Sequence, residues 1–177
     1  KGGLIRKGGV LVHVPAGHAT RVVDFGRGPV TAAAIPWGDV STAYHSTGIP
    51  DITVYMGMPL ALRIGMRVTR LLGGLLAAAP VQRFLLARVR SGAAGPSDAE
   101  RARGASLLWG EARDAAGKRV VSRLRGPEGY TLTADASIAL VQRVLAGEHP
   151  AGFQTPSKAY GADFVLGLPG VERSDEG

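Results

Sequence analysis

The stretch IPWGDVSTAYHSTGIPDITVYM, residues 35–56, lies between a β-rich first third of the chain and a helical middle. Its polar side chains are concentrated in residues 37–47, which we call the polar segment. Glycine and proline interrupt the stretch at four positions: Pro36, Gly38, Gly48 and Pro50. Residues of this kind are typical of turns, so the sequence predicts a loop between two strands here.

Short apolar runs around glycine turns predict two β-hairpins before the polar segment. The first joins residues 4–5 to residues 10–14, and the second joins residues 20–25 to residues 30–35 around Gly26-Arg27-Gly28-Pro29. Residues 52–56 predict a further strand directly after the segment. The first third of the chain is therefore expected to be mostly β.

Helical periodicity replaces this pattern in the middle of the chain. Helices are predicted over residues 59–72 and 81–90, on either side of Gly73-Gly74, and over residues 134–146 with Thr133 or Asp135 as its cap. Residues 106–113 and 119–124 flank DAAGK and predict another hairpin, which residues 131–133 would extend as a strand.

Strands, then two helices, then a hairpin and a helix are an α+β order, because strict βαβ alternation is missing. We expect one domain with a largely antiparallel or mixed sheet built from hairpins and helices packed on one face. That domain should span residues 1–170, and residues 171–177 should form a flexible tail. The chain starts without methionine and in mid-pattern, so we expect it to be a fragment of a longer protein.

Composition restricts the chemistry. The 177 residues include no cysteine, which excludes disulfides and thiol nucleophiles, and the N-terminus has no apolar signal core. We therefore expect a cytoplasmic protein, with membrane association as an alternative. The net charge is +7, and most of it comes from residues 57–126, which hold thirteen basic and four acidic residues.

Several familiar sites are absent from the sequence. Gly26-Arg27-Gly28-Pro29 has Thr31 where a dinucleotide fingerprint needs its third glycine, so a hairpin turn is favoured. Neither HExxH nor GxSxG occurs, and the four histidines show no metal-ligand spacing. Aromatic residues are 6% of the chain and do not interleave with the arginines. We expect no metal and no nucleic-acid partner.

Three arginines of the first predicted helix, Arg63, Arg67 and Arg70, fall within an arc of about 60°. They form either a solvated face, a contact for an acidic carrier, partner domain or phosphorylated ligand, or a contact for an anionic membrane surface. The last alternative is open because the rest of the helix is apolar. The longest apolar run, residues 71–81, is too short to span a bilayer.

The polar segment is the strongest local signal for a site. Trp37 offers an apolar wall, Asp39 a carboxylate, and Tyr44 and His45 proton donors or acceptors. Hydroxyl groups accompany them at Ser41, Thr42, Ser46 and Thr47. The alternative is that Asp39 and the hydroxyls cap local turns and that Trp37 is a core residue.

The whole stretch of residues 35–56 resembles the C-terminal half of saccharopine dehydrogenase-like oxidoreductases, together with TRVVDFGRGPVTAAA before it and LLWGEARDAAGKRVVSRLRGPEGYTLTADASIALVQRVLAG and GFQTPSKAYGADFVLGLPG after it. The similarity covers nearly all of residues 1–170. It favours the short bacterial branch that includes trans-acting enoyl reductases.

This resemblance implies an N-terminal Rossmann domain that binds NADP or NAD, is absent from this chain, and would be its partner. It also implies a homodimer contact and an acyl-carrier or lipid-type substrate. Tyr44 and His45 would be proton donors and Asp39 would orient His45. Substrate contacts would come from Trp37, Ser41, Thr42, Ser46 and Thr47, and carrier or phosphate contacts from Arg63, Arg67 and Arg70.

Two classes of function follow. The chain is either the substrate-binding and dimerisation half of a nicotinamide-dependent oxidoreductase, or a non-catalytic binding or membrane-peripheral module with the same fold. By the resemblance, this fragment alone should be inactive.

Overall fold

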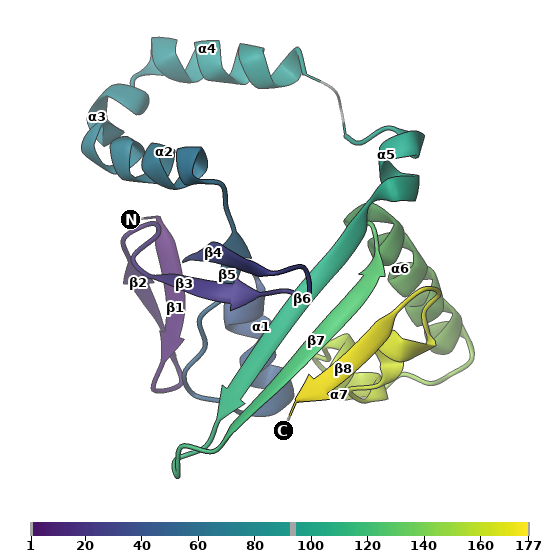
Figure 1. Ribbon diagram of the computed structural model, residues 1–177. Coiled ribbons are helices and arrows are strands. Elements are labelled where there is room, and N and C mark those ends of the chain that lie inside the picture. The colour runs from purple at the N-terminus through teal and green to yellow at the C-terminus, as the bar shows by residue number, and fades with distance from the viewer. Residues whose placement is uncertain (1, 93–94, 177) are drawn as a thin grey trace. The chain divides into compact units, whose positions relative to one another are not determined.

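The computed structural model in Figure 1 describes residues 2–92 and 95–176, and it describes residues 66–71, 73 and 75 by their backbone only. Helices and three small antiparallel sheets make up the described chain, which confirms the α+β class and the hairpin-built sheets. Contacts gather into two compact units. The first unit is Lys1–Val23 with Val30–Pro96, and the second is Asp24–Pro29 with Ser97–Gly177.

The strands of the first unit confirm both early hairpins. Strands β1 (Gly3–Lys7) and β2 (Val10–Val14) pair antiparallel, from Gly3 opposite Val14 to Lys7 opposite Val10. A second sheet has the order β3 (Thr20–Asp24), β4 (Pro29–Ala34) and β5 (Tyr55–Gly57). The strand predicted over residues 52–56 thus begins later, and Ile52 instead forms an isolated bridge with Arg6 of β1. This bridge joins β1 to the segment between α1 and β5.

The predicted loop in the polar segment is wrong, because Asp39–Thr47 form helix α1. Asp39 lies in the first turn, where a carboxylate is favourable near the helix N-terminus. Gly48 ends the helix with φ of 71°, a left-handed conformation that favours glycine, and its N–H donates to the Tyr44 carbonyl. Val40 is fully buried and anchors α1 in the core.

Three consecutive helices follow β5 in the first unit: α2 (Leu60–Leu71), α3 (Gly73–Leu76) and α4 (Ala79–Arg90) (Figure 1). The predictions over residues 59–72 and 81–90 are confirmed. Pro80 lies in the first turn of α4, where its missing N–H costs nothing. None of the residues of α4 is buried.

The core of the first unit is built from small side chains. Ala32, Ala33 and Ala34 of β4 are buried together with Val23, Val40 and one larger side chain, Ile35. Such a core offers little apolar area per residue, because hydrophobic stabilisation scales with the area removed from water. Polar contacts therefore carry a larger share of the stability in this unit.

Arg6 makes the most extensive of these polar contacts. It is 7% exposed, and its Nε donates to the Val40 carbonyl at 3.0 Å. Nη1 donates to the Gly9 carbonyl at 2.6 Å, and Nη2 donates to the Ser41 carbonyl at 3.4 Å. One side chain thus joins the β1–β2 hairpin to the first turn of α1.

The second unit contains the predicted hairpin and an unexpected third strand. Strands β6 (Ala105–Arg113) and β7 (Arg119–Pro127) pair along their whole length, from Ala105 opposite Pro127 to Arg113 opposite Arg119. Strand β8 (Glu172–Glu176) pairs with the other edge of β7. The prediction of a flexible tail at residues 171–177 is therefore wrong for residues 172–176.

The helices of the second unit are α5 (Asp98–Arg103), α6 (Gly129–Leu145), α7 (Pro156–Tyr160) and the 3₁₀ turn η1 (Phe164–Gly167). The strand predicted over residues 131–133 is wrong, since these residues belong to α6. The carboxylate of Glu128 caps that helix by accepting from the N–H groups of Tyr130 and Thr131, so the predicted caps at Thr133 and Asp135 are also wrong. The Thr133 hydroxyl instead donates to the Gly129 carbonyl.

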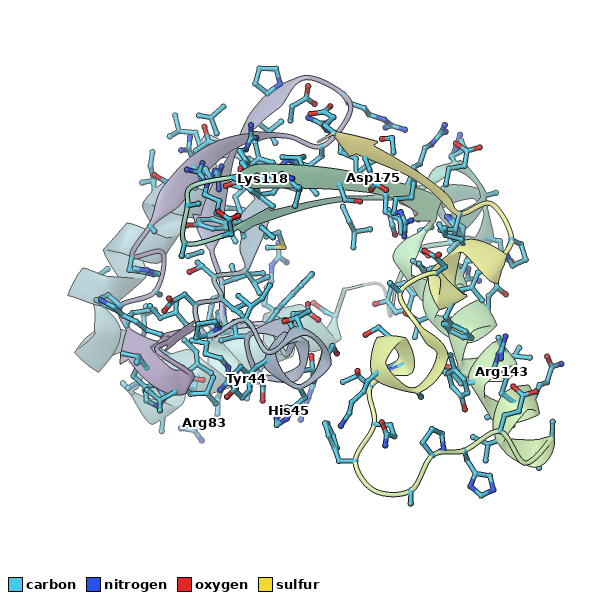
Figure 2. The ribbon with its side chains drawn as sticks, turned by 90° about the horizontal axis from the view of Figure 1, so that it is seen from below. Tyr44, His45, Arg83, Lys118, Arg143 and Asp175 are labelled. Atoms are coloured by element: carbon cyan, nitrogen blue, oxygen red, sulfur yellow. The ribbon has the colours of Figure 1, made fainter. Side chains whose placement is uncertain are left out.

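An aromatic cluster holds the end of α6 to the segment that follows it. The Arg143 guanidinium lies 5.1 Å from the ring centre of Tyr160 and 5.6 Å from that of Phe164, and it also pairs with Glu148. Figure 2 labels Arg143 on α6. The Tyr160 hydroxyl donates to the Glu148 carbonyl, which closes the loop between α6 and α7.

Replacing Arg6 tests whether it holds the first unit together. Arg6→Ala should lower the free energy of unfolding by about 2 to 4 kcal/mol, because it removes three hydrogen bonds from a charged, buried group. Lys7→Ala, the exposed neighbour on β1, should change it by less than about 0.5 kcal/mol. Urea unfolding followed by circular dichroism measures both values, and equal effects for the two variants would contradict the assignment.

Candidate functional site

Helix α1 places most of the polar segment on one short, partly exposed element. Trp37 precedes the helix and is 57% exposed, so the alternative that it is a core residue is wrong. Asp39 and His45 are also exposed, whereas Tyr44 is half-buried. The segment therefore presents an aromatic wall, a carboxylate, a phenol and an imidazole near the surface of the first unit.

The hydroxyl groups of the polar segment serve the helix itself. Thr42 Oγ1 donates to the Gly38 carbonyl at 3.2 Å, and Thr47 Oγ1 donates to the Ala43 carbonyl at 2.7 Å. Ser46 Oγ donates to the Thr42 carbonyl at 3.4 Å. Hydroxyls bonded to a carbonyl four residues earlier are a common feature of helix interiors. This geometry supports the alternative of local bonding over substrate contact for these three residues.

The geometry of α1 does not support a role for Asp39 in orienting His45. The two residues are six positions apart, which separates them by about 9 Å along the axis and about 120° around it. Asp39 lies in the first turn and His45 in the last. Each is placed to interact favourably with the helix dipole, the carboxylate at the N-terminus and the imidazole at the C-terminus.

Tyr44 and His45 are the pair that the structure does bring together. Their ring centres are 5.8 Å apart with an edge-to-face angle of 71°. Figure 2 shows both side chains side by side on α1. The Arg6 guanidinium lies over the Tyr44 ring, 4.4 Å from its centre, which adds a cation–π contact and fixes the plane of the phenol.

The hydroxyl of Tyr44 lies beside the turn of the β1–β2 hairpin. A Cβ atom added at Gly9 would stand 3.6 Å from this hydroxyl, so the glycine leaves space next to it. Within the described residues, the hydroxyl makes no hydrogen bond to a protein group. A phenol that is held by its ring and whose proton has no protein acceptor is available to donate to a ligand.

The predicted arginine contact is described only in part. Arg63 is half-buried on α2, and its Nε is a buried atom with no hydrogen bond to a described residue. The side chains of Arg67 and Arg70 lie outside the described residues.

A pocket of about 370 Å³ in the second unit was missed by the sequence reasoning. It is lined by side chains of the β3–β4 turn and of the sheet, four of them arginines: Arg27, Arg123, Arg125 and Arg173. The alternation of Arg119, Arg123 and Arg125 with apolar residues along β7 is the signal that could have indicated a basic sheet face.

Carboxylates pair with two of these arginines. Arg123 pairs with Glu176, and its Nε donates to the Asp24 carbonyl at 2.9 Å. Arg173 bonds Asp163 at 2.6 Å, a contact that raises the pKa of its guanidinium, with a further contribution from Asp175. An ion pair thus holds β8, and a hydrogen bond holds the β3–β4 turn, onto β7 at this pocket.

Among residues 2–92 and 95–176, no cluster of three or more histidine, aspartate or glutamate side chains is arranged to hold a metal ion. Within the same part of the chain, every helix is too short or too polar to cross a bilayer.

Comparison with known proteins identifies no family for this chain. No family model, no curated protein and no solved structure matches it. The proposed function therefore rests on the geometry of α1 and of the helices near it, and on the sequence motifs of the resemblance.

The β3–β4 turn gives the molecule a pH-dependent contact. Asp24 Oδ1 accepts from the N–H of Gly26 at 2.7 Å and from that of Gly28 at 3.0 Å, and these bonds lower the pKa of the Asp24 carboxyl. Both glycines have positive φ, so the predicted hairpin turn is confirmed.

Because the pKa of Asp24 is lower in the folded state, its contribution to stability is fully present above pH 3.8. It is lost as the pH falls below 3.8 and through the folded-state pKa. The stability difference between the wild type and Asp24→Asn, measured by thermal unfolding, should be constant near neutrality and shrink over that acidic window. A difference that stays constant down to pH 2 would contradict this account.

Proposed function

We propose that this chain is the substrate-side domain of a nicotinamide-dependent oxidoreductase of the saccharopine dehydrogenase-like type, acting on an enoyl or related lipid-type acyl group. The observation that carries the proposal is Tyr44. Its ring is held by Arg6, while its hydroxyl has no protein partner among the described residues. That is the arrangement expected of a general acid, which must keep a proton free for the substrate.

Reduction of a conjugated enoyl group requires a hydride at the β-carbon and a proton at the α-carbon. In the proposal, the Tyr44 hydroxyl gives the proton, and the C–H bond forms as the O–H bond breaks. His45, exposed and 5.8 Å from Tyr44, is placed near solvent to return a proton to the phenolate. Arg6 stabilises the phenolate electrostatically while it is present.

The described residues do not fit the cofactor. The glycines at Gly26 and Gly28 form a hairpin turn, and their N–H groups are bonded to Asp24 rather than open to a pyrophosphate. The proposal therefore assigns NADP or NAD to a separate N-terminal Rossmann domain, and it assigns only substrate contact and proton delivery to this chain.

The substrate class is argued from the apolar surface near the arginines. Large apolar side chains of α2 and α4 are exposed, including Leu60, Leu62 and Phe84. An acyl chain would cover such a surface, whereas a substrate with two amino-acid carboxylates would leave it in water. Arg63, Arg67 and Arg70 would then contact an acidic carrier or a phosphate arm, and a homodimer contact stays part of the proposal.

The test is turnover of trans-2-enoyl thioesters by the natural protein that contains this chain, followed by oxidation of NADPH or NADH. Tyr44→Phe should lower kcat/KM by about 100-fold or more, the usual effect of losing a general acid. His45→Gln should have a smaller effect, since solvent can also return the proton. Tyr130→Phe, an exposed tyrosine in the second unit, should leave the rate unchanged.

If the natural protein turns over none of these substrates, the oxidoreductase proposal is contradicted and the non-catalytic binding module becomes the favoured alternative. Full turnover in a Tyr44→Phe, His45→Gln double variant would support an oxidoreductase but would show that neither residue takes part in the mechanism. Thermal melting of each variant must match the wild type, because Tyr44 also packs against Arg6.

A further inference from the structure

We propose that helices α2 and α4 dock this protein onto the surface of an anionic lipid bilayer. The bilayer would cover the same exposed side chains of α2 and α4 that the proposed function gives to an acyl chain and its carrier, so the two occupants compete for one surface. The docking proposal rests on the charge pattern of one long segment, on the exposure of apolar side chains along two helices, and on how the two kinds of residue are mixed.

The segment from Ile52 to Ser97 carries charge of one sign only. It holds six arginines and no aspartate, glutamate, lysine or histidine. The nearest acidic residues are Asp51 and Asp98, one on each side of it. A basic segment of this kind is attracted to the negative surface potential of anionic headgroups.

Helix α4 exposes its apolar side chains. Phe84 is 69% exposed and Val89 is 74% exposed, and Leu85 and Leu86 between them are also exposed. No residue of the helix is buried. Leaving this much apolar area in water is unfavourable, and patches of this kind mark surfaces that contact a protein or a membrane.

The wheel of α4 suits a helix that lies in the plane of a bilayer surface. At 100° per residue, Val81, Leu85 and Val89 form one ridge, with Phe84 and Leu86 about 100° to either side of it. Arg83 and Arg90 project from about the opposite side. Arg88 lies beside the ridge, where its long side chain can reach the headgroups while its methylene groups stay in the apolar layer. Figure 2 labels Arg83 at the periphery of the first unit.

Helix α2 repeats this arrangement in the residues whose side chains are described. Leu60, Leu62 and Ile64 are exposed. Arg63 lies between them in sequence and keeps its Nε buried without a hydrogen bond to a described group. Two successive helices thus offer apolar side chains together with arginines, which is the composition of interfacial helices.

An anionic bilayer fits these features better than a protein partner does. The core of a protein interface is depleted of most charged residues other than arginine, and a protein partner would need acidic side chains placed opposite each of these arginines. Here, arginines are distributed among the apolar residues of both helices. A bilayer surface accepts this mixture, because headgroup phosphates and acyl chains are available at every point along a helix that lies flat.

The proposal is tested by co-sedimentation of the purified chain with vesicles. The probes are phosphatidylcholine vesicles and vesicles that also contain about 30% phosphatidylglycerol. We expect binding to the anionic vesicles at least about tenfold stronger than to the neutral ones. Raising the salt from about 0.1 M to about 1 M should weaken it, because the Debye length falls from about 10 Å to about 3 Å.

Two pairs of variants separate the apolar and the charged contributions. Phe84→Glu with Val89→Glu should abolish binding, whereas Ile138→Glu with Leu145→Glu, equally exposed residues of α6, should not. Replacing Arg83, Arg88 and Arg90 with glutamine should weaken binding more than the same replacement of the exposed residues Arg27, Lys118 and Arg125. All of the substituted positions lie at the surface, so circular dichroism should show unchanged folding.

Three outcomes would overturn the proposal. The first is no binding to anionic vesicles. The second is equal binding to neutral and anionic vesicles, and the third is an equal loss of binding in the α4 variants and their controls. If the wild-type protein does not bind vesicles but turns over a short-chain enoyl thioester normally, only the docking proposal is contradicted. If it binds anionic vesicles but shows no turnover, only the proposed reaction is contradicted.

Discussion

The first unit depends on a buried arginine whose guanidinium donates hydrogen bonds to backbone carbonyls. Arg6 lies on β1, and the carbonyls it reaches on α1 belong to Val40 and Ser41, 34 and 35 residues further along the chain. Half of the buried apolar residues described in this unit are alanines, which bury little area, so a directional contact of this kind helps to decide where α1 sits. The same guanidinium covers the Tyr44 ring, and the position of the candidate proton donor is therefore set by a residue of the hairpin.

This arrangement connects folding to the proposed chemistry. A phenol that donates a proton has to be held still, yet its hydroxyl has to remain accessible. Arg6 satisfies the first condition through the face of the ring, and the glycine at position 9 satisfies the second by leaving space beside the hydroxyl. Bonds from the hydroxyls of Thr42, Ser46 and Thr47 to the helix backbone stiffen the same short element and are not needed for substrate contact.

Local patterns predicted most elements of the fold and missed those that depend on distant contacts. The hairpins and helices α2, α4 and α6 follow from glycine turns and apolar periodicity, which are visible within a few residues. Helix α1 was missed because serine, threonine and flanking proline favour turns, and its burial through Val40 is a tertiary effect. Strand β8 was missed because ERSDE looks like a solvated tail, and pairing with β7 makes it a strand.

The same distinction applies to the candidate site. The sequence could indicate that Tyr44 and His45 belong together, because they are neighbours in any conformation. It could not show that Asp39 and His45 lie on different sides of a helix, since the segment was expected to be a loop. The ion pairs of Arg123 and Arg173 could not be predicted either, because their partners include Glu176, in the segment expected to be a tail, and Asp163, in the loop before it.

The charges of strand β8 also bear on self-association of this protein. An outer strand of a sheet offers unpaired N–H and C=O groups on which another chain can add a strand. All five residues of β8 are exposed, and four of them are charged. A second molecule that paired there would have to bring charges of both signs close to its own backbone and strip them of water. The charged side chains of β8, three acidic and one basic, thus disfavour the addition of a further strand to the sheet.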